Sequence, residues 1–349
     1  MGDYEKEREL GAGQFGVVWL AFHKGLGIRH AVKFIREENV VDPTEFFREP
    51  QLLRQLEHPN IVKVEDAGKT ADGELFIAME YLRLGSVADR YKGRPVPLRR
   101  LKPIVCEALR GVEYAHHKGY VHRDIKPANI LIARGGIGRL SDFGLATKVD
   151  PGGTASPQGY IAHLAPEVLL SGRTSPLSDV YAMGVTLYRM VNGDSLLPRF
   201  RSMDGYSSAI VEGRYPDRDS YRVYVPKSLK RVINKAMNVD EHKRFQGATE
   251  LRLALEQTTL ACSWREVVDK DSRSWMSDSD EFGSVAVRMR YSRVDTWNVE
   301  TLLSRKRDAD LRRVRALCAT DLTEEDALKR VSLITASFVN NSPIKTFGQ

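Results

Sequence analysis

The spacing of hydrophobic residues divides the chain into two regions of different predicted secondary structure. From Tyr4 to about Tyr81, short apolar runs of strand character surround one helical segment, Pro43 to Leu56. From about Val87 to Gln257, apolar residues recur at helical spacing in segments that loops separate. We therefore predict a β-rich N-terminal lobe followed by a larger helical lobe.

Four segments of the second region carry an apolar stripe on one helical face. Predicted helices run from Pro97 to Lys118, Ser178 to Val191, Pro226 to Met237 and Ala248 to Glu256. The first of them stops at Gly119, a typical helix terminator. No internal repeat and no low-complexity linker interrupts this region.

After about Leu260 the chain changes character. Three of the four tryptophans lie here, and a segment rich in aromatic residues is not expected to be disordered. Hydrophobic residues at every second position predict a strand with one buried face, namely Val285, Val287, Met289 and Tyr291. Thr323 and Asp326 form a capping box ahead of a helical stripe of Leu328, Val331, Ile334 and Phe338. We expect a small α+β unit that docks on the helical lobe, because no flexible linker precedes it.

Composition narrows the class of protein only slightly. The chain has 349 residues, 42% of them hydrophobic and 28% charged, as in a globular protein. Its net charge of +7 fits an anionic ligand but does not indicate nucleic acid by itself. Cys106, Cys262 and Cys318 are widely spaced, so neither a disulfide framework nor a zinc site is expected. No signal peptide or membrane-spanning run is visible, and a cytoplasmic location is expected.

Two segments of the N-terminal region suggest phosphate binding. A glycine-rich loop lies between two strand-like stretches and consists of Gly11, Ala12, Gly13, Gln14, Phe15 and Gly16. Its position disfavours a dinucleotide fold, in which the glycines open a helix, and leaves either a phosphate-binding loop or a plain hairpin turn. Lys33 lies inside a strand-like run, where it either meets an anionic partner or belongs to an edge strand.

Longer motifs in the helical region distinguish these alternatives. They are His122-Arg123-Asp124-Ile125-Lys126-Pro127-Ala128-Asn129, Ser141-Asp142-Phe143-Gly144, Ala165-Pro166-Glu167 and Ser178-Asp179-Val180-Tyr181-Ala182-Met183-Gly184, with Arg244 further on. In this set and its order the sequence resembles the eukaryotic-like serine/threonine protein kinases, and the bacterial ones more than the animal ones. Phosphoryl transfer depends on positioning and charge neutralisation, which these polar types supply.

The resemblance implies a role for each motif residue. Asp124 accepts or orients the proton of the attacking hydroxyl, and Lys126 supports the transferred phosphate. Lys33 holds the phosphates of ATP and is held by Glu49, while Asn129 and Asp142 bind Mg²⁺. Nucleotide contacts are expected from Gly11, Ala12, Gly13, Gln14, Phe15, Gly16, Val18, Ala31, Met79, Glu80, Leu82 and Leu131. Arg244 is expected to form a structural ion pair with Glu167.

The implied architecture is the two-lobed α+β protein kinase fold. Its N-lobe covers about residues 1–80 and its C-lobe about 83–260, so that residues 1–260 form the kinase domain and 261–349 an α+β appendage. The implied activity is ATP-dependent phosphorylation of serine or threonine in a protein substrate, including its own activation segment. Nucleic acid is not an expected partner, and the partner of the appendage is not identified. A pseudokinase scaffold and a small-molecule phosphotransferase are the rival interpretations.

Two features depart from the family pattern. Pro50 directly follows Glu49, so the helix is either kinked or begins there, and the pair with Lys33 is expected to be weakened. Glu45 is an alternative to Glu49.

Before Ala165, the counterpart of the family's conserved threonine is either Ser156 or Tyr160. We expect an activating phosphate on Thr154 or Ser156, close to Arg123.

Overall fold

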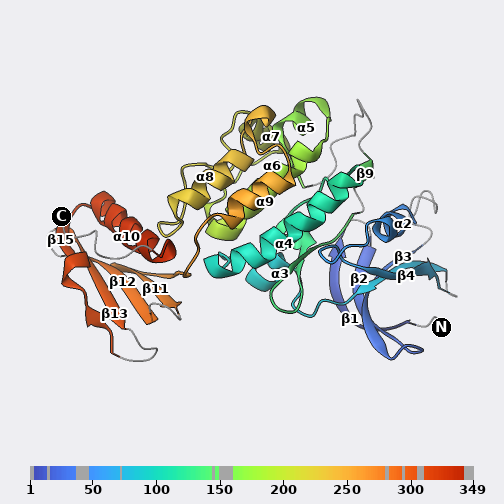
Figure 1. The fold of residues 1–349 in the computed structure, drawn as a ribbon, viewed down its shortest axis with the longest axis horizontal. Coiled ribbons are helices and arrows are strands. Elements are labelled where there is room, and N and C mark those ends of the chain that lie inside the picture. Colours follow the sequence, from blue (N-terminus) through green and yellow to red (C-terminus); the bar gives the residue numbers. More distant parts are fainter. Residues whose placement is uncertain are drawn as a thin grey trace.

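A computed structural model describes residues 4–13, 16–36, 47–70, 73–143, 146–148, 160–279, 283–292, 295–304 and 310–341 of the chain. An N-terminal sheet, a group of helices and a C-terminal sheet follow one another along the sequence. Figure 1 shows the three parts in the same order along the longest axis of the molecule. The mixed α+β class expected from the sequence is confirmed.

The N-terminal sheet has five antiparallel strands in the order β1-β2-β3-β5-β4. The strands are β1 (Tyr4–Gly13), β2 (Gly16–His23), β3 (Ile28–Arg36), β4 (Val64–Lys69) and β5 (Glu74–Glu80). In β3, Val32 and Phe34 are buried, whereas Ala31 and Lys33 between them are half-buried. Side chains alternate across a strand, so Ala31 and Lys33 share the face opposite to that small core.

Helix α2 (Arg48–Gln55) lies within the helical segment expected from Pro43 to Leu56, of which residues 43–46 lie outside the described part of the chain. Pro50 is its third residue, and the Gln51 backbone N–H donates to the Phe47 carbonyl at 3.0 Å. The first four N–H groups of a helix have no acceptor within it, so a proline in the first turn removes no helical hydrogen bond. The helix therefore begins beside Pro50 and is not kinked by it.

The helical region has one almost entirely buried helix, α6, at its centre. Its helices are α3 (Val87–Tyr91), α4 (Leu98–His117), α5 (Pro166–Ser171), α6 (Pro176–Asn192), α7 (Met203–Val211), α8 (Lys227–Ala236) and α9 (Ala248–Glu256). The four helices predicted here are confirmed as α4, α6, α8 and α9, each within two residues at both ends. In α6, Tyr181, Leu187 and Tyr188 are all 0% exposed, which makes this helix the core of the lobe.

Short strands position the loops that carry the motifs. They form two antiparallel pairs, β6 (Tyr120–Val121) with β9 (Thr147–Lys148) and β7 (Ile130–Ile132) with β8 (Gly138–Leu140). Residues 122–129 therefore lie between β6 and β7, with a 3-10 turn, η2 (Pro127–Asn129), at their end.

The C-terminal unit is a six-stranded antiparallel sheet with one helix packed on it. Its elements are β10 (Arg265–Asp269), β11 (Ser272–Ser279), β12 (Gly283–Tyr291), β13 (Trp297–Ser304), β14 (Arg312–Arg313), β15 (Ala319–Leu322) and α10 (Glu324–Val339). The expected strand is β12, with Val285, Val287 and Met289 buried as predicted, but Tyr291 at its end is 43% exposed and Ala286 on the other face is buried, so the prediction of one buried face is wrong at these two positions. The expected cap is also present, since the Thr323 hydroxyl accepts from the Asp326 N–H at 3.1 Å. The strand itself and the cap are confirmed.

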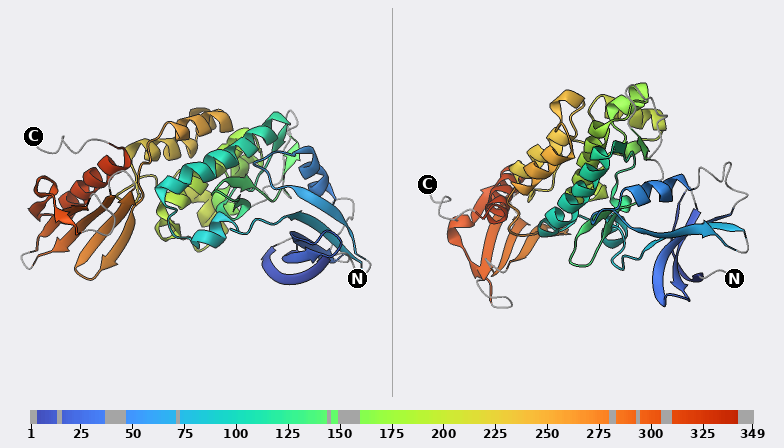
Figure 2. Two further views of the ribbon diagram at one scale, coloured as in Figure 1. Left: turned by 60° about the horizontal axis from the view of Figure 1, so that its bottom comes forward. Right: turned by 45° about the vertical axis from the view of Figure 1, so that its right-hand side comes forward.

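This unit lies against the end of the helical lobe, as the views of Figure 2 agree. Arg222 pairs with Glu266 of β10 at 2.6 Å. The Ser263 hydroxyl accepts from the Arg99 N–H at 3.0 Å in the first turn of α4, a backbone group that α4 itself cannot satisfy. Cys262 and Trp264 are buried. The expected docking is confirmed.

Among the described helices, none has the length and apolar character needed to cross a bilayer.

Candidate active site

Asp179, on the buried helix α6, holds the backbone of the loop that precedes η2. Its Oδ2 accepts from the His122 N–H at 2.8 Å and its Oδ1 from the Arg123 N–H at 2.9 Å. His116 Nε2 lies 2.8 Å from the same Oδ2. Burial raises the pKa of Asp179, but the hydrogen bond from His116 and the contacts with His122 outweigh it and hold this pKa below its ordinary value. The carboxylate therefore stays charged and fixes the loop.

Two residues near this carboxylate have left-handed backbone conformations that side chains disfavour. Arg123 has φ 67° and Asp142 has φ 61°. Such a conformation costs about 1 to 2 kcal/mol for a residue that has a Cβ. The bond from the Arg123 N–H to Asp179 offsets that cost. Strain held in place by a buried partner is typical of functional sites.

Asp124 is 6% exposed, and its two carboxylate oxygens differ. Oδ2 accepts from Lys126 Nζ at 2.6 Å and from Asn129 Nδ2 at 2.9 Å. Oδ1 is buried and has no hydrogen-bond partner among the described residues. A buried charged acceptor without a donor is costly, so this oxygen is ready to take a proton or a hydroxyl hydrogen.

Asn129 is oriented by the same aspartate. Its Nδ2 also donates to the Asp124 carbonyl at 2.8 Å. Because both donor directions of the amide face Asp124, its Oδ1 acceptor is directed elsewhere. Amide and carboxylate oxygens are ligands that Mg²⁺ accepts.

Asp142 is brought beside this loop by the residues on either side of it. The Ser141 N–H donates to the Asn129 carbonyl at 2.9 Å, and the Ser141 carbonyl lies 3.0 Å from His122 Nε2. Phe143, 1% exposed, packs edge-on against the His122 ring with centroids 4.6 Å apart. Asp142 itself is half-buried. The motif residues Asp124, Asn129 and Asp142, separate in sequence, thus lie in adjoining segments.

The glycine-rich loop connects β1 and β2, with Gly13 opposite Gly16. Gly16 has φ 125°, and a Cβ there would lie 2.7 Å from the Phe34 carbonyl oxygen, so only glycine fits. Gly11 is exposed, and Ala12 and Gly13 complete β1. Gln14 and Phe15 lie outside the described residues.

The expected nucleotide contacts on the sheet fall in neighbouring positions. Lys33 is opposite Val18, and Ala31 is opposite Met79, in the strand registers. All four side chains are half-buried.

The end of β5 contributes Glu80, the segment after it contributes Leu82, and β7, which a bridge joins to this segment, contributes Leu131. The Glu80 carboxylate pairs with Arg139 and accepts from the Lys63 N–H at 2.9 Å, so it points away toward β4 and β8. Leu82 and Leu131 are half-buried, and the bridge between Ser86 and Leu131 brings β7 against this segment.

Several expected residues cannot be placed. The backbone of Glu49 belongs to α2, but its side chain lies outside the described part of the chain, as do Glu45, Thr154 and Ser156. The pair between Lys33 and Glu49 and the activating phosphosite stay predictions.

His163 has a defined place next to the helical core. It is 3% exposed in η3 (Ile161–His163), where Arg189 Nη1 donates to its Nε2 at 3.0 Å and Thr186 Oγ1 lies 3.4 Å from its Nδ1. Burial, together with the charge of Arg189, lowers the pKa of His163 to about 3. The ring is therefore neutral and joins the segment before Ala165 to α6. The role of Asp179 was also not predicted, although it lies within a quoted motif.

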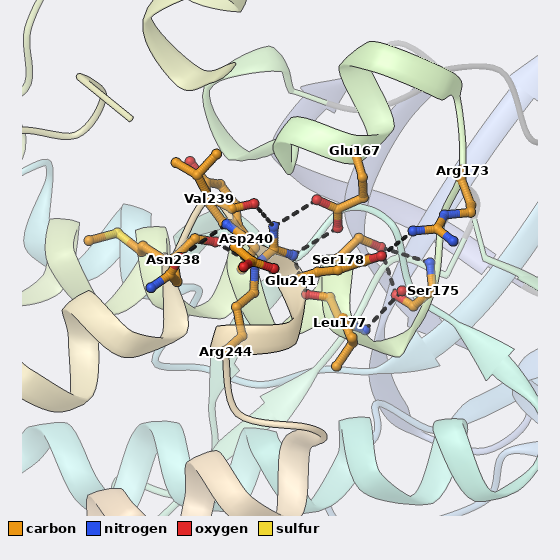
Figure 3. Close-up of polar contacts among 12 residues, drawn as sticks. Glu167, Arg173, Ser175, Leu177, Ser178, Asn238, Val239, Asp240, Glu241 and Arg244 are labelled. Carbon is orange, nitrogen blue, oxygen red and sulfur yellow. Dashed lines mark hydrogen bonds and ion pairs between the residues drawn. The ribbon is translucent and has the colours of Figure 1, made fainter. Parts of the chain in front are cut away.

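The ion pair predicted between Arg244 and Glu167 is confirmed (Figure 3). Arg244 is 2% exposed, and its two terminal nitrogens lie 2.8 and 2.7 Å from the two oxygens of Glu167. The same guanidinium donates to the carbonyls of Asn238, Leu177 and Val239. This network fixes α5 beside α6 and contains no reacting group.

Comparisons with known proteins agree with these motifs. A family model described as "Protein kinase domain" matches residues 4–254 and ends before the C-terminal sheet. The serine/threonine-protein kinase PknJ of Mycobacterium tuberculosis is 35% identical over 261 residues, or 71% of this chain and 44% of that protein. The serine/threonine-protein kinase pkn2 of Myxococcus xanthus is 32% identical over 279 residues, or 75% and 33% respectively. PknA of Mycobacterium tuberculosis is 38% identical over 205 residues, or 55% and 47%. The chain spans less than half the length of each of these relatives.

Proposed function

The chain belongs to the protein kinase family, and we propose that it transfers the γ-phosphoryl group of Mg-ATP to serine and threonine hydroxyls of protein substrates. The observation that carries the proposal is the asymmetry of Asp124. One of its oxygens is held by Lys126 and Asn129, while the other is buried without a partner among the described residues.

Asp124 acts on the attacking hydroxyl. A substrate hydroxyl that donates to Asp124 Oδ1 would satisfy the unpaired acceptor and point its oxygen at the phosphate. Lys126 has two tasks, since its ammonium neutralises Asp124 Oδ2 and stands beside the site of transfer. A charge of this kind stabilises the negative oxygens of the transferred group.

Mg²⁺ and ATP are the cofactors of the proposed reaction. Asn129, through its outward Oδ1, and the Asp142 carboxylate are the residues that would hold the metal. Bound Mg²⁺ neutralises phosphate charge and orients the phosphates. Lys33 would hold the phosphates under the glycine-rich loop and would pair with Glu49. The adenine ring would lie between Val18 and Ala31 on one side and Leu131 on the other, with Met79 behind it.

The catalytic domain would comprise residues 1–260 and the C-terminal unit residues 261–349. The match to the family covers only the first of these parts. The second part is docked by Arg222 and Ser263, so recruitment of a partner or regulation of the lobe is its proposed role.

The proposal is tested with labelled ATP and Mg²⁺ on the wild type and on Asp124→Asn, followed by mapping of phosphorylated residues. Asp124→Asn should lower turnover by about 10²- to 10⁴-fold, the usual contribution of a positioned base, while nucleotide binding is retained. Asp219→Asn, at an exposed aspartate of the same lobe, is the matched control and should be fully active.

Equal turnover by Asp124→Asn and the wild type would contradict the proposal. A wild type that binds nucleotide without any turnover would indicate the pseudokinase alternative. Mapping also decides whether Thr154 or Ser156 is phosphorylated.

A further inference from the structure

A run of contacts leads from α6 to the surface next to the proposed site of transfer. His163 of η3 is bonded to α6, and Tyr160 packs on its ring with centroids 5.8 Å apart. Tyr160 is 51% exposed. The Thr186 hydroxyl, 3.4 Å from His163 Nδ1, also donates at 3.5 Å to the carbonyl of Ile125, the residue after Asp124. This chain of contacts connects the exposed ring of Tyr160 to the loop that carries Asp124.

This surface continues along α7, which packs against η3 and α5. Three aromatic rings fix the entry to α7. Phe200 lies 5.0 Å from Tyr206 and 6.3 Å from Tyr215, and these two tyrosines lie 5.6 Å apart. Tyr215 is 1% exposed, so the cluster is anchored in the core. The chain on either side of Phe200 is accordingly held in place.

Arg199 and Arg201 flank Phe200, and both are exposed. Neither has an ion pair or a side-chain hydrogen bond among the described residues. Other arginines of this region do have carboxylate partners. Arg189 is paired with Asp194 at 2.8 Å, and Arg214 is paired with Glu212 at 2.6 Å. We call Arg199 and Arg201 the arginine pair.

The acidic groups around the arginine pair do not neutralise it. Asp194 is engaged by Arg189, and Asp204 lies in the first turn of α7, where a negative charge is stabilised by the helix N-terminus. Met203, which lies between Arg201 and Asp204 in the sequence, is 64% exposed and adds an apolar side chain to this surface. A basic and partly apolar surface fits an acidic polypeptide better than a neutral or basic one.

We propose that the arginine pair selects protein substrates that carry aspartate or glutamate a few residues from the phosphorylated hydroxyl. This inference rests on the proposed kinase function and specifies its substrate class. Guanidinium groups bind carboxylates through paired hydrogen bonds, and two of them on one fixed segment favour two adjacent acidic residues. The arginine pair touches no reacting atom, so it should change substrate affinity and leave the chemical step alone.

The test uses the full chain and peptides with one serine or threonine. In one series of peptides, an Asp-Asp pair is placed from one to six residues away from the serine or threonine, on either side of it. Peptides with Lys-Lys in place of Asp-Asp serve as references. Exposed ion pairs contribute modestly, so the loss of both in Arg199→Ala with Arg201→Ala should raise KM for the best acidic peptide by about two- to thirtyfold. The value of kcat should not change.

A charge-reversed variant makes the test sharper. Arg199→Glu with Arg201→Glu should lose the preference for acidic peptides and gain activity on Lys-Lys peptides. The matched control is Lys227→Glu with Arg231→Glu on α8, two exposed basic residues elsewhere on the lobe. Raising the salt concentration should also reduce the preference in the wild type.

An equal KM for acidic and basic peptides, or an acidic preference that survives charge reversal, would overturn the inference while transfer itself continued. Loss of transfer to every peptide and to the chain itself would instead overturn the proposed function, and this inference with it. Selection of a phosphorylated peptide over its aspartate counterpart, with no preference for aspartate over lysine, would also refute it.

Discussion

The helical lobe holds charged side chains in two different settings, its interior and its seam with the C-terminal sheet. In the interior, Arg244 has a side chain 0% exposed and its partner Glu167 one 11% exposed. At the seam, the side chains of Arg222 and Glu266 are 22% and 8% exposed. The charges of the interior pair are compensated almost only by their protein partners, whereas water also hydrates part of the Arg222 side chain at the seam.

This difference predicts different costs for the same kind of substitution. A buried charge that loses its partner keeps its full desolvation penalty, and breaking such a pair costs about 3 to 5 kcal/mol. A group that water reaches recovers much of that penalty by hydration. Three substitutions test the comparison, from the largest expected effect to the smallest.

Arg244→Met should lower the free energy of unfolding by about 3 to 5 kcal/mol, because it leaves Glu167 charged and without its fork of donors. Urea denaturation followed by circular dichroism measures the loss. Arg173→Met is the control, since it removes the neighbouring pair with Glu241, in which the arginine is 56% exposed, and should cost at most about 1 kcal/mol. Equal losses in the two variants would show that burial does not set the cost.

His163→Phe should change the pH dependence of stability. In the folded protein the pKa of His163 is lowered to about 3, below its unfolded value near 6.5. The folded state therefore excludes a proton that the unfolded state binds. This contribution is complete above about pH 6.5 and is lost as the pH falls toward 3, with a slope of up to about 1.4 kcal/mol per pH unit.

Urea denaturation of the wild type and of His163→Phe at pH 7.5, 6.5, 5.5 and 4.5 measures this slope. The variant should lose stability less steeply on acidification. His242→Phe, at an exposed position, is the matched control. Identical slopes in the wild type and His163→Phe would show that the ring takes up a proton in the folded state.

Glu266→Gln should have the smallest effect, about 1 kcal/mol. The amide keeps one acceptor oxygen, enough for either Arg222 or Arg273 but not for both, and it loses the charge, while both arginines remain partly exposed to water. Differential scanning calorimetry should show a modest decrease in Tm, with the C-terminal sheet still docked by Ser263. A decrease in the free energy of unfolding as large as that of Arg244→Met would mean that water does not compensate the charges at the seam.

The sequence predicted what depends on short spacing. The four long helices, the strand β12 and the cap at Thr323 follow local patterns, and these predictions are confirmed. The residues around Asp124 were predicted because the motif spans only a few positions. Helix α7 was missed because its sequence, with Gly205 and two serines, has a weak apolar stripe.

Contacts between distant segments could not be predicted in this way. The bonds from Asp179 to the loop at His122 join residues 57 positions apart, and no local pattern reports them. Arg222 and Glu266 are likewise 44 positions apart. Of the two alternatives for Pro50, a kinked helix or a helix that begins there, the structure shows the second, and hydrophobic spacing alone could not decide between them.

Because the carboxylate of Asp179 holds the loop before η2, that loop loses its conformational entropy during folding and not during substrate binding. Three groups of the loop and of α4 converge on one side chain of an almost entirely buried helix. The conformational freedom of that loop is therefore given up when the chain folds, at about 1 to 2 kcal/mol per residue, and not when a substrate arrives. Binding energy from ATP and substrate is then available for the reacting atoms instead of for ordering the protein around them.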